Sequence, residues 1–205
     1  DQSFKAQQPF YSENSTLLCN GEIYNHKILK NNYALTCFSD SDCECILHLY
    51  DQFGFTNVLD VLSGDYAIVI STDTTVYFAR DPIGVRPLFY GTTKDGGFAL
   101  ASYARALSEF CCSVEHVPPG WGRYDRKTGK LDIFTHDHTP YKITYHLNDD
   151  LEKTIRTTLV KSVKSRLMSD RPIGCLLSGG LDSSLVASIL CKLTEPSNVR
   201  TYSIG

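Results

Sequence analysis

A run of small and hydroxyl-bearing residues near the C-terminal end has the composition of an anion site. Apolar residues at 173–177 predict a short buried strand, and the apolar periodicity of residues 185–190 predicts a helix. A strand–turn–helix unit of this kind aims backbone N–H groups and the positive end of the helix dipole at an anion. The small residues of the turn and of the first helical turn are Ser178, Gly179, Gly180, Ser183 and Ser184. We therefore expect this turn to bind phosphate.

The same turn also has a simpler structural interpretation, in which Ser-Gly-Gly serves only to pack a helix against a strand. The whole run 176–184 favours nucleotide binding instead, because its glycines let a phosphate approach the main chain closely. The turn contains no lysine, so it is not a Walker A loop.

A second group of polar residues follows an apolar strand near the N-terminal end. Asn20 and Gly21 can offer a side-chain amide and a backbone N–H to one point, which is an arrangement that stabilises an oxyanion. Losing one such donor typically costs about 3–4 kcal/mol of transition-state stabilisation. Asn-Gly by itself is more often only a turn. Likewise, residues 41–44 can be a plain helix start capped by Ser41, and residues 80–88 a loop whose charges pair with each other.

The composition narrows the class of protein. The chain has 205 residues, 42% of them hydrophobic, and a net charge of −3, so it can form a packed core and shows no basic surface for nucleic acid or an anionic membrane. Its apolar runs are too short to span a bilayer. The eight cysteines form no C-x-x-C unit, which favours reduced thiols in the cytoplasm. A zinc site is the weaker alternative, since the spacing of its candidate ligands fits no common pattern: Cys43, Cys45, Cys111, Cys112, His136 and His138.

Short strands and turns predict a β-rich first part. The hairpin signals pair residues 65–71 with 76–80, and residues 88–91 with 98–102. Because residues 66–70 are apolar on both faces, that strand should be covered on both sides. Helices are expected over 25–33 and 42–53, the second ending at Gly54.

The C-terminal part has a pattern of alternating helices and strands instead. Asn148 is expected to cap a helix whose apolar positions recur as far as Leu167, and the strand and helix of the glycine turn follow it. A β-rich part followed by a βαβ pattern indicates two domains. The chain starts at Asp1 rather than methionine and stops at Gly205 directly after a predicted strand, so we expect an internal fragment.

Taken in order, these segments resemble the glutamine-hydrolysing asparagine synthetases. The matching motifs run along essentially the whole chain: NGEIYNH, SDCE, ARDPIGVRPLFYG, RLMSD and GCLLSGGLDSSLVAS. The resemblance implies an α+β fold followed by an α/β fold. Residues 1–135 would form a partial αββα N-terminal-nucleophile domain of the class II glutamine amidotransferase type, residues 136–147 a linker, and residues 148–205 the start of a parallel-sheet adenine nucleotide alpha hydrolase-like domain.

The resemblance also implies a two-site reaction on glutamine, aspartate and ATP, with Mg²⁺. A cysteine at the mature N-terminus would attack the glutamine amide and release ammonia. ATP would convert aspartate to β-aspartyl-AMP, with pyrophosphate leaving, and ammonia from an internal tunnel would displace AMP. That cysteine and much of the synthetase domain are expected outside this chain, so the fragment alone is expected to be inactive. A homodimer is also expected.

Individual roles follow from the matching positions. Asn20 and Gly21 match the oxyanion hole, and together with Glu22 and Asp42 they match the glutamine-binding residues. The residues that match the ATP and pyrophosphate site are Leu176, Ser178, Gly179, Gly180, Leu181, Asp182, Ser183, Ser184 and Ile204. Asp182 would also help to hold Mg²⁺, while Leu176 and Ile204 can equally be strand core. Arg80, Asp81 and Arg86 match a loop near the amidotransferase site, for which we predict structural ion pairing.

Two other functions fit the same residues. One is a different adenylating amidotransferase of the same architecture. The other is a non-catalytic, truncated relative that only binds a nucleotide or a partner.

Overall fold

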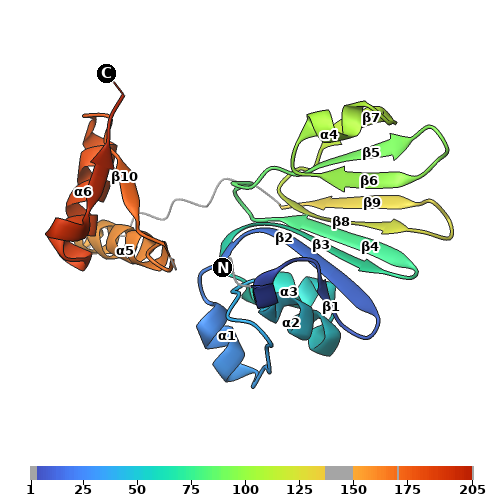
Figure 1. Ribbon diagram of the computed structural model, residues 1–205, viewed down its shortest axis with the longest axis horizontal. Coiled ribbons are helices and arrows are strands. Elements are labelled where there is room, and N and C mark those ends of the chain that lie inside the picture. The colour runs from blue at the N-terminus through green and yellow to red at the C-terminus, as the bar shows by residue number, and fades with distance from the viewer. Residues whose placement is uncertain (1–3, 137–149, 170, 205) are drawn as a thin grey trace. The chain divides into compact units, whose positions relative to one another are not determined.

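The computed structural model describes residues 4–136, 150–169 and 171–204. The chain divides into two compact units, Asp1–Thr139 and Pro140–Gly205 (Figure 1). Apart from His136, the expected linker at 136–147 lies outside the described residues. Within the described ranges, no helix combines the length and the hydrophobicity that a membrane span needs.

The first unit is built around an antiparallel six-stranded sheet with the strand order β1-β2-β3-β4-β8-β9. Its strands are β1 (Phe10–Tyr11), β2 (Ser15–Ile23), β3 (Gly64–Thr72), β4 (Thr75–Arg80), β8 (Gly120–Asp125) and β9 (Leu131–Thr135). A second antiparallel sheet has the order β6-β5-β7, made of β5 (Phe89–Thr93), β6 (Phe98–Ala101) and β7 (Cys111–His116). Both predicted hairpins, β3–β4 and β5–β6, are confirmed.

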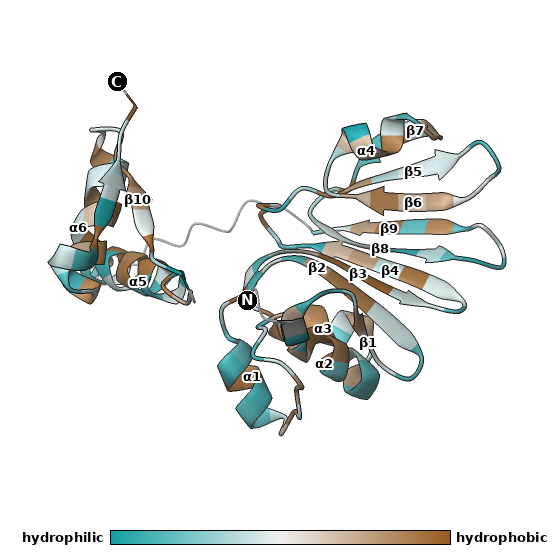
Figure 2. Cartoon of the chain, viewed as in Figure 1, coloured by the Kyte–Doolittle hydropathy of each residue, from teal (hydrophilic) through white to brown (hydrophobic). Residues whose placement is uncertain are grey.

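Helices cover the outside of both sheets. On the six-stranded sheet lie α1 (His26–Asn32), α2 (Cys45–Phe53) and α3 (Phe55–Val61), and α4 (Ala104–Ser108) packs against the three-stranded sheet (Figure 1). One core joins α2 and α3 to β2 and β3, and a second lies between the sheets around Phe78, Leu88 and Val117. Hydrophobic residues concentrate accordingly in α2, α3 and the inner strands (Figure 2). The layers follow the predicted αββα order.

Strand β3 is covered on both sides, as its sequence predicts. Ile68 and Ile70 are fully buried in the core under the helices, whereas Ala67 belongs to the core between the sheets. Strand β2 differs, because Leu17 and Ile23 are fully buried while Leu18 is half-exposed. One face of β2 therefore anchors the fold, and its other face is open for a site.

The helix expected over 42–53 begins later, at Cys45. The Glu44 side chain turns back to accept hydrogen bonds from the Phe38 N–H at 2.7 Å and the Ser39 N–H at 2.8 Å. Burial tends to raise the pKa of Glu44, but these bonds and one from the Ser39 hydroxyl leave that pKa below its usual range. Gly54, with φ +79°, ends α2 as predicted, but the next helix, α3, was not predicted.

The second unit contains α5 (Leu151–Ser165), β10 (Gly174–Leu176), α6 (Leu181–Leu193) and β11 (Arg200–Tyr202). Strands β10 and β11 pair in parallel, with Leu176 beside Tyr202. Asp150 caps α5 by accepting the Lys153 N–H, in place of the expected Asn148, which lies outside the described residues.

The surface of α5 carries apolar side chains. None of its residues is buried, and Leu151 and Ile155 are each 57% exposed. A groove of about 650 Å³ between α5 and α6 is lined in part by Ile155, Leu159, Leu185 and Ile189. This helix pair thus presents hydrophobic side chains bordered by the charged Glu152, Arg156 and Lys192.

The loop after β4 is held by two buried charged residues that do not pair with each other. Arg80 is 4% exposed and donates to the carbonyl oxygens of Arg86 at 2.6 Å and Val117 at 2.7 Å. Asp81 is 2% exposed, and its carboxylate accepts from backbone N–H groups. Those donors are Tyr66, Ile83, Gly84, Val85 and Arg86. For Arg80 and Asp81 the predicted ion pairing is therefore wrong: main-chain groups bind both side chains, and Arg80 also lies 3.0 Å from His116 Nε2.

Replacing Asp81 should destabilise the first unit. In Asp81→Asn, an amide NH₂ takes the place of one carboxylate oxygen and faces backbone donors, so we expect a loss of about 2–3 kcal/mol in the free energy of unfolding. Urea denaturation measures the loss. Asp73→Asn, in the exposed turn between β3 and β4, is the matched control and should change stability by less than about 0.5 kcal/mol. Equal effects of the two variants would contradict this role of Asp81.

Candidate functional site

The end of β2 presents polar groups in two directions. Asn20 and Glu22 alternate with the buried Cys19 and Ile23, so they share the face away from the helices. The Asn20 amide donates to the Ser102 hydroxyl at 3.1 Å. The other direction is the strand edge opposite β3, where the Cys19 N–H donates to Gln8 and the Ile23 N–H donates to Asp42.

The N–H of Gly21 points to that same edge. N–H groups of an antiparallel strand alternate between its two edges, so residue 21 follows residues 19 and 23. No described group accepts a hydrogen bond from the Gly21 N–H. Asn20 and Gly21 thus carry an amide side chain and a backbone donor at neighbouring positions, one on a face and the other on an edge of the same strand.

Gly21 also has a structural reason to be glycine. A Cβ built there would lie 2.2 Å from the Asp65 carbonyl oxygen and 2.6 Å from the Tyr66 Cα on β3. No side chain fits such an approach, so the position sets the register of β2 against β3.

Asp42 reaches this strand end from the segment before α2. Its Oδ2 accepts the Ile23 N–H at 2.6 Å, and the Cys45 thiol donates to its carbonyl oxygen at 3.0 Å. Oδ1 accepts no hydrogen bond within the described residues. The structure thus brings Asn20, Gly21, Glu22 and Asp42 together, although they come from separate segments.

The thiols around Asp42 are not poised for attack. Burial raises the pKa of Cys45 to about 12, and a hydrogen bond with Cys19, together with burial, raises that of Cys43 well above its usual value. Both thiols stay protonated at neutral pH, so neither supplies a thiolate nucleophile.

The rest of the NGEIYNH motif has a structural role that sequence reasoning missed. Asn25 accepts the Ser63 N–H at 3.0 Å and donates to the Val61 carbonyl at 2.8 Å. The Tyr24 hydroxyl donates to Asp65 at 2.6 Å. These bonds tie the turn after β2 to the start of β3 and thereby fix the strand end that carries the polar groups.

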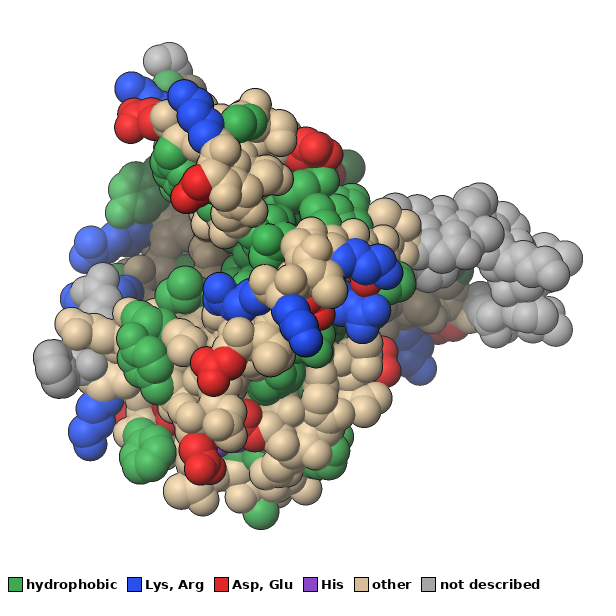
Figure 3. All heavy atoms as spheres, turned by 90° about the vertical axis from the view of Figure 1, so that its right-hand side faces the viewer, with side chains coloured by type: hydrophobic (Ala, Val, Ile, Leu, Met, Phe, Trp, Pro, Cys, Tyr) green, Lys and Arg blue, Asp and Glu red, His purple; other side chains and the backbone are tan. Residues whose placement is uncertain are grey.

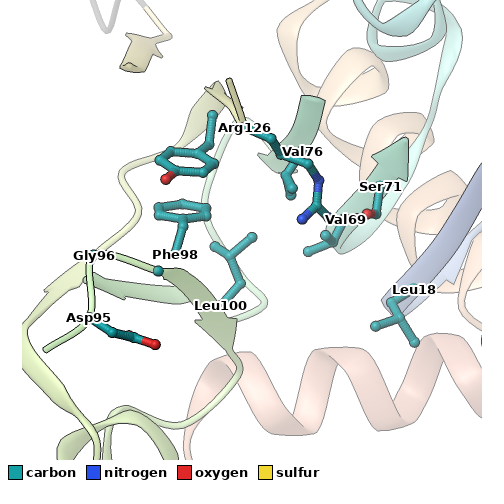
Figure 4. Close-up of a pocket in the computed structure, with 11 residues that line it drawn as sticks. Leu18, Val69, Ser71, Val76, Asp95, Gly96, Phe98, Leu100 and Arg126 are labelled. Carbon is teal, nitrogen blue, oxygen red and sulfur yellow. Dashed lines mark hydrogen bonds between the residues drawn. The ribbon is translucent and has the colours of Figure 1, made fainter. Parts of the chain in front are cut away.

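Two pockets lie along the side of β2 and β3 that faces away from the helices. A pocket of about 220 Å³ beside Asn20 is lined in part by Gln8, Leu18 and Ser102. A second pocket of about 540 Å³ shares Leu18, Val69 and Leu100 with it. Figure 4 shows Leu100 and Phe98 on one side of this second pocket, with Val69 and Leu18 on the other. Figure 3, which views the hairpin side of the first unit, shows hydrophobic side chains exposed in a hollow.

The predicted phosphate loop lies between β10 and α6. Gly179 has φ +81°, which favours glycine, and no atom lies within 4 Å of the position its Cβ would take. Among the described residues, no acceptor binds the backbone N–H groups from Gly179 to Ser183. These amides are therefore available to an anion at the start of a helix.

The serine side chains of the loop bond within it. The Ser183 hydroxyl donates to the Gly180 carbonyl at 3.2 Å and lies 3.0 Å from that of Ser178. The Ser184 hydroxyl donates to the same Gly180 carbonyl at 2.7 Å. In this arrangement the serines shape the turn, and the backbone supplies the free donors.

The apolar residues beside the loop are exposed. Leu176 is 78% exposed and Leu181 82%, and Ile204, two residues beyond β11, is fully exposed. The strand-core interpretation of Leu176 and Ile204 is thus not what the described residues show. Both lie at the carboxyl ends of parallel strands, which is where open α/β sheets bind ligands.

Asp182 stands in the first turn of α6. It belongs to none of the groups of three metal-ligating side chains in the described part of the chain. Mg²⁺ in nucleotide sites is commonly held by one or two carboxylates together with substrate phosphates. A single carboxylate beside an anion-binding turn fits that donor set.

Comparison with known proteins gives a family match in each of the two units. A family model for a glutamine amidotransferase domain matches residues 1–124. The chain belongs to the glutamine amidotransferase domain family. A second model, for asparagine synthase, matches residues 154–205, which include the phosphate loop. The resemblance to asparagine synthetase is thereby confirmed.

Curated relatives match this chain across nearly its whole length. A probable glutamine-hydrolysing asparagine synthetase of Acanthamoeba polyphaga mimivirus is 37% identical, over 100% of this chain and 42% of its own length. Asparagine synthetase 3 of Arabidopsis thaliana is 41% identical over 97% of this chain and 36% of its own length. The Bos taurus asparagine synthetase is 37% identical over 92% of this chain and 39% of its own length. The chain thus spans about two-fifths of the length of these relatives.

Solved structures confirm the predicted fold class. Glutamine phosphoribosylpyrophosphate amidotransferase from B. subtilis matches with a TM-score of 0.56 and 21% identity, over 99% of this chain and 49% of that chain. The allosteric regulatory enzyme of purine biosynthesis matches with a TM-score of 0.56 and 24% identity, over 98% of this chain and 48% of that chain. At this identity, the likeness concerns the fold alone.

Substitution of Gly21 should disrupt the strand end. Gly21→Ala forces β2 away from β3 because the new Cβ would overlap backbone atoms, and we expect a loss of more than about 2 kcal/mol in unfolding free energy. Chemical denaturation measures this loss. Leu18→Ala, on the half-exposed face of the same strand, should cost less than about 1 kcal/mol. A Gly21→Ala protein as stable as the parent would show that the close approach is absent.

Proposed function

We propose that this chain contributes to both sites of a glutamine-hydrolysing asparagine synthetase. The reaction converts ATP, L-aspartate and L-glutamine to L-asparagine, L-glutamate, AMP and pyrophosphate through β-aspartyl-AMP. The enzyme is a ligase that forms a carbon–nitrogen bond. One observation carries the proposal: relatives with this name match across both units, from the strand end at Asn20 to the phosphate loop.

On the glutamine side, the proposed roles follow from the donors of β2. The Asn20 amide and the Gly21 N–H stabilise the oxyanion that forms when a thiolate attacks the glutamine amide. Glu22 helps to hold glutamine, and Asp42 binds its α-amino group through the free Oδ1. The thiols of Cys43 and Cys45, which lie beside Asp42, stay protonated and do not supply that thiolate.

On the ATP side, the backbone amides of 179–183 bind the β and γ phosphates, which leave as pyrophosphate. The serines Ser178, Ser183 and Ser184 maintain the turn. Leu176, Leu181 and Ile204 supply exposed apolar surface, and of these Leu176 and Ile204 line the adenosine pocket. Asp182 takes part in holding Mg²⁺, which neutralises phosphate charge when bound.

The two halves are needed together for a chemical reason. A carboxylate oxygen is a poor leaving group, so aspartate must be adenylated before ammonia can displace AMP. We propose residues 1–135 as the ammonia-producing domain and residues 148–205 as part of the adenylating domain. The cytoplasm is the proposed compartment, because all eight cysteines are free. A homodimer stays a prediction.

Loss of the Asn20 amide should affect asparagine synthesis from glutamine but not from ammonium salts. In the protein that contains this chain, Asn20→Ala should lower glutamine-dependent asparagine synthesis by about 10²–10³-fold, since one oxyanion donor is lost. Synthesis from ammonium salts should be unchanged. Thr74→Ala, in the exposed β3–β4 turn, is the control for both rates. An equal fall with both nitrogen sources would contradict the role of Asn20.

Asp182→Asn should have the converse effect. Adenylation of aspartate, followed as pyrophosphate release, should fall by more than about tenfold because Mg²⁺ loses a carboxylate. Glutamine hydrolysis should persist, and Glu195→Gln, exposed beyond α6, should behave as the parent.

The products also discriminate between the functions. Release of ADP and phosphate would exclude an adenylating enzyme. Amidation of a different carboxylate would indicate another adenylating amidotransferase, and nucleotide binding without turnover would indicate a non-catalytic relative.

A further inference from the structure

Three side chains of different chemistry meet at the start of α2. They are Cys37, Glu44 and His48, and one ligand atom of each lies within 4.8 Å of the other two. His48 Nε2 is 3.5 Å from Glu44 Oε1. The three atoms are a thiol sulfur, a carboxylate oxygen and an imidazole nitrogen.

The fold holds this cluster through short local contacts. Glu44, the residue directly before α2, and His48 in α2 are four residues apart, so their side chains lie on the same side of the helix. The hydrogen bonds from Phe38 and Ser39 fix the Glu44 carboxylate and also fix the segment that carries Cys37. The cluster is therefore preorganised by main-chain contacts.

The cluster is open to solvent on one side. The Glu44 side chain is 5% exposed and that of His48 25%, while Cys37 is half-buried. The charged group that faces the cluster from another element is Lys30, whose ammonium donates to the Ser39 and Ser41 carbonyl oxygens. Burial raises the pKa of Cys37, and the charge of Lys30 and its hydrogen bond with Cys37 oppose this rise, so a metal ion must displace the Lys30 ammonium. A metal ion that binds here must also displace the thiol proton.

We propose that Cys37, Glu44 and His48 bind one divalent ion of the zinc type. Ligands about 2.1 Å from a tetrahedral ion lie roughly 3.4 Å apart, which matches the His48–Glu44 separation. Mixed sulfur, nitrogen and oxygen ligands suit zinc better than magnesium or calcium. Water occupies the fourth position. The simpler interpretation is an i,i+4 histidine–glutamate contact beside a Cys37 thiol whose hydrogen-bond partner is Lys30.

The spacing explains why the sequence did not reveal the site. The candidates that the sequence suggested were Cys43, Cys45, Cys111, Cys112 and His136, with His138 outside the described residues. Cys37 joins the cluster through the back-turned Glu44 side chain rather than through a compact ligand motif. The proposed ion links α2 to the segment that precedes it, so binding should raise the thermal midpoint.

Titration of the full chain with Co²⁺, after treatment with a chelator, tests the proposal. A cobalt–thiolate charge-transfer band should appear with one equivalent and disappear when Zn²⁺ displaces the Co²⁺. Cys37→Ser should remove the band and weaken Zn²⁺ binding by more than about tenfold. His48→Gln should weaken binding but keep the band at higher Co²⁺ concentration.

Matched controls use a thiol and an imidazole that are exposed elsewhere. Cys112→Ser and His136→Gln should bind as the parent does. Metal-free Cys37→Ser should melt at the parent's metal-free midpoint, which separates loss of a ligand from loss of fold. The proposal is overturned if the parent shows no band, if Cys37→Ser keeps the band, or if Cys112→Ser removes it.

Discussion

The hydrogen bond from the Ile23 N–H to the Asp42 carboxylate is the contact on which the first site depends. It joins the end of β2 to the segment before α2, across nineteen residues of sequence. With the register set by Gly21, it leaves the Gly21 N–H on the strand edge beside the Asp42 carboxylate, while the Asn20 amide lies on the adjoining face. A rigid, polar corner thus arises from a strand whose opposite face is buried core.

Buried carboxylates shape two loops of the first unit in the same way. Asp81 gathers five backbone N–H groups, and Glu44 folds the preceding segment onto α2. Each replaces a regular hydrogen-bond ladder with a charged side chain that is nearly inaccessible to solvent. The charged residues of these motifs therefore serve to fold their loops as much as to build a site.

Local patterns predicted the parts of the fold that local sequence determines. Turn residues located both hairpins, the apolar run located the doubly covered β3, and the glycine turn located the start of α6. Contacts distant in sequence caused the errors. The helix α2 begins later than expected, because the Glu44 side chain bonds the preceding segment. Arg80 donates to main-chain carbonyls instead of forming the expected ion pairs. The resemblance assigned Asn20 and Asp42 to one site, but the sequence did not reveal the contacts that the structure shows, Ile23 N–H to Asp42 and Asn20 to Ser102.

The uncovered apolar side of α5 has a practical consequence for handling the protein. Leucine and isoleucine side chains exposed along one helix adhere to any similar surface. Self-association should therefore grow with concentration when the chain is produced by itself. Mild detergents, or substitution of Ile155 by a charged residue, should keep such preparations dispersed without touching either set of polar groups.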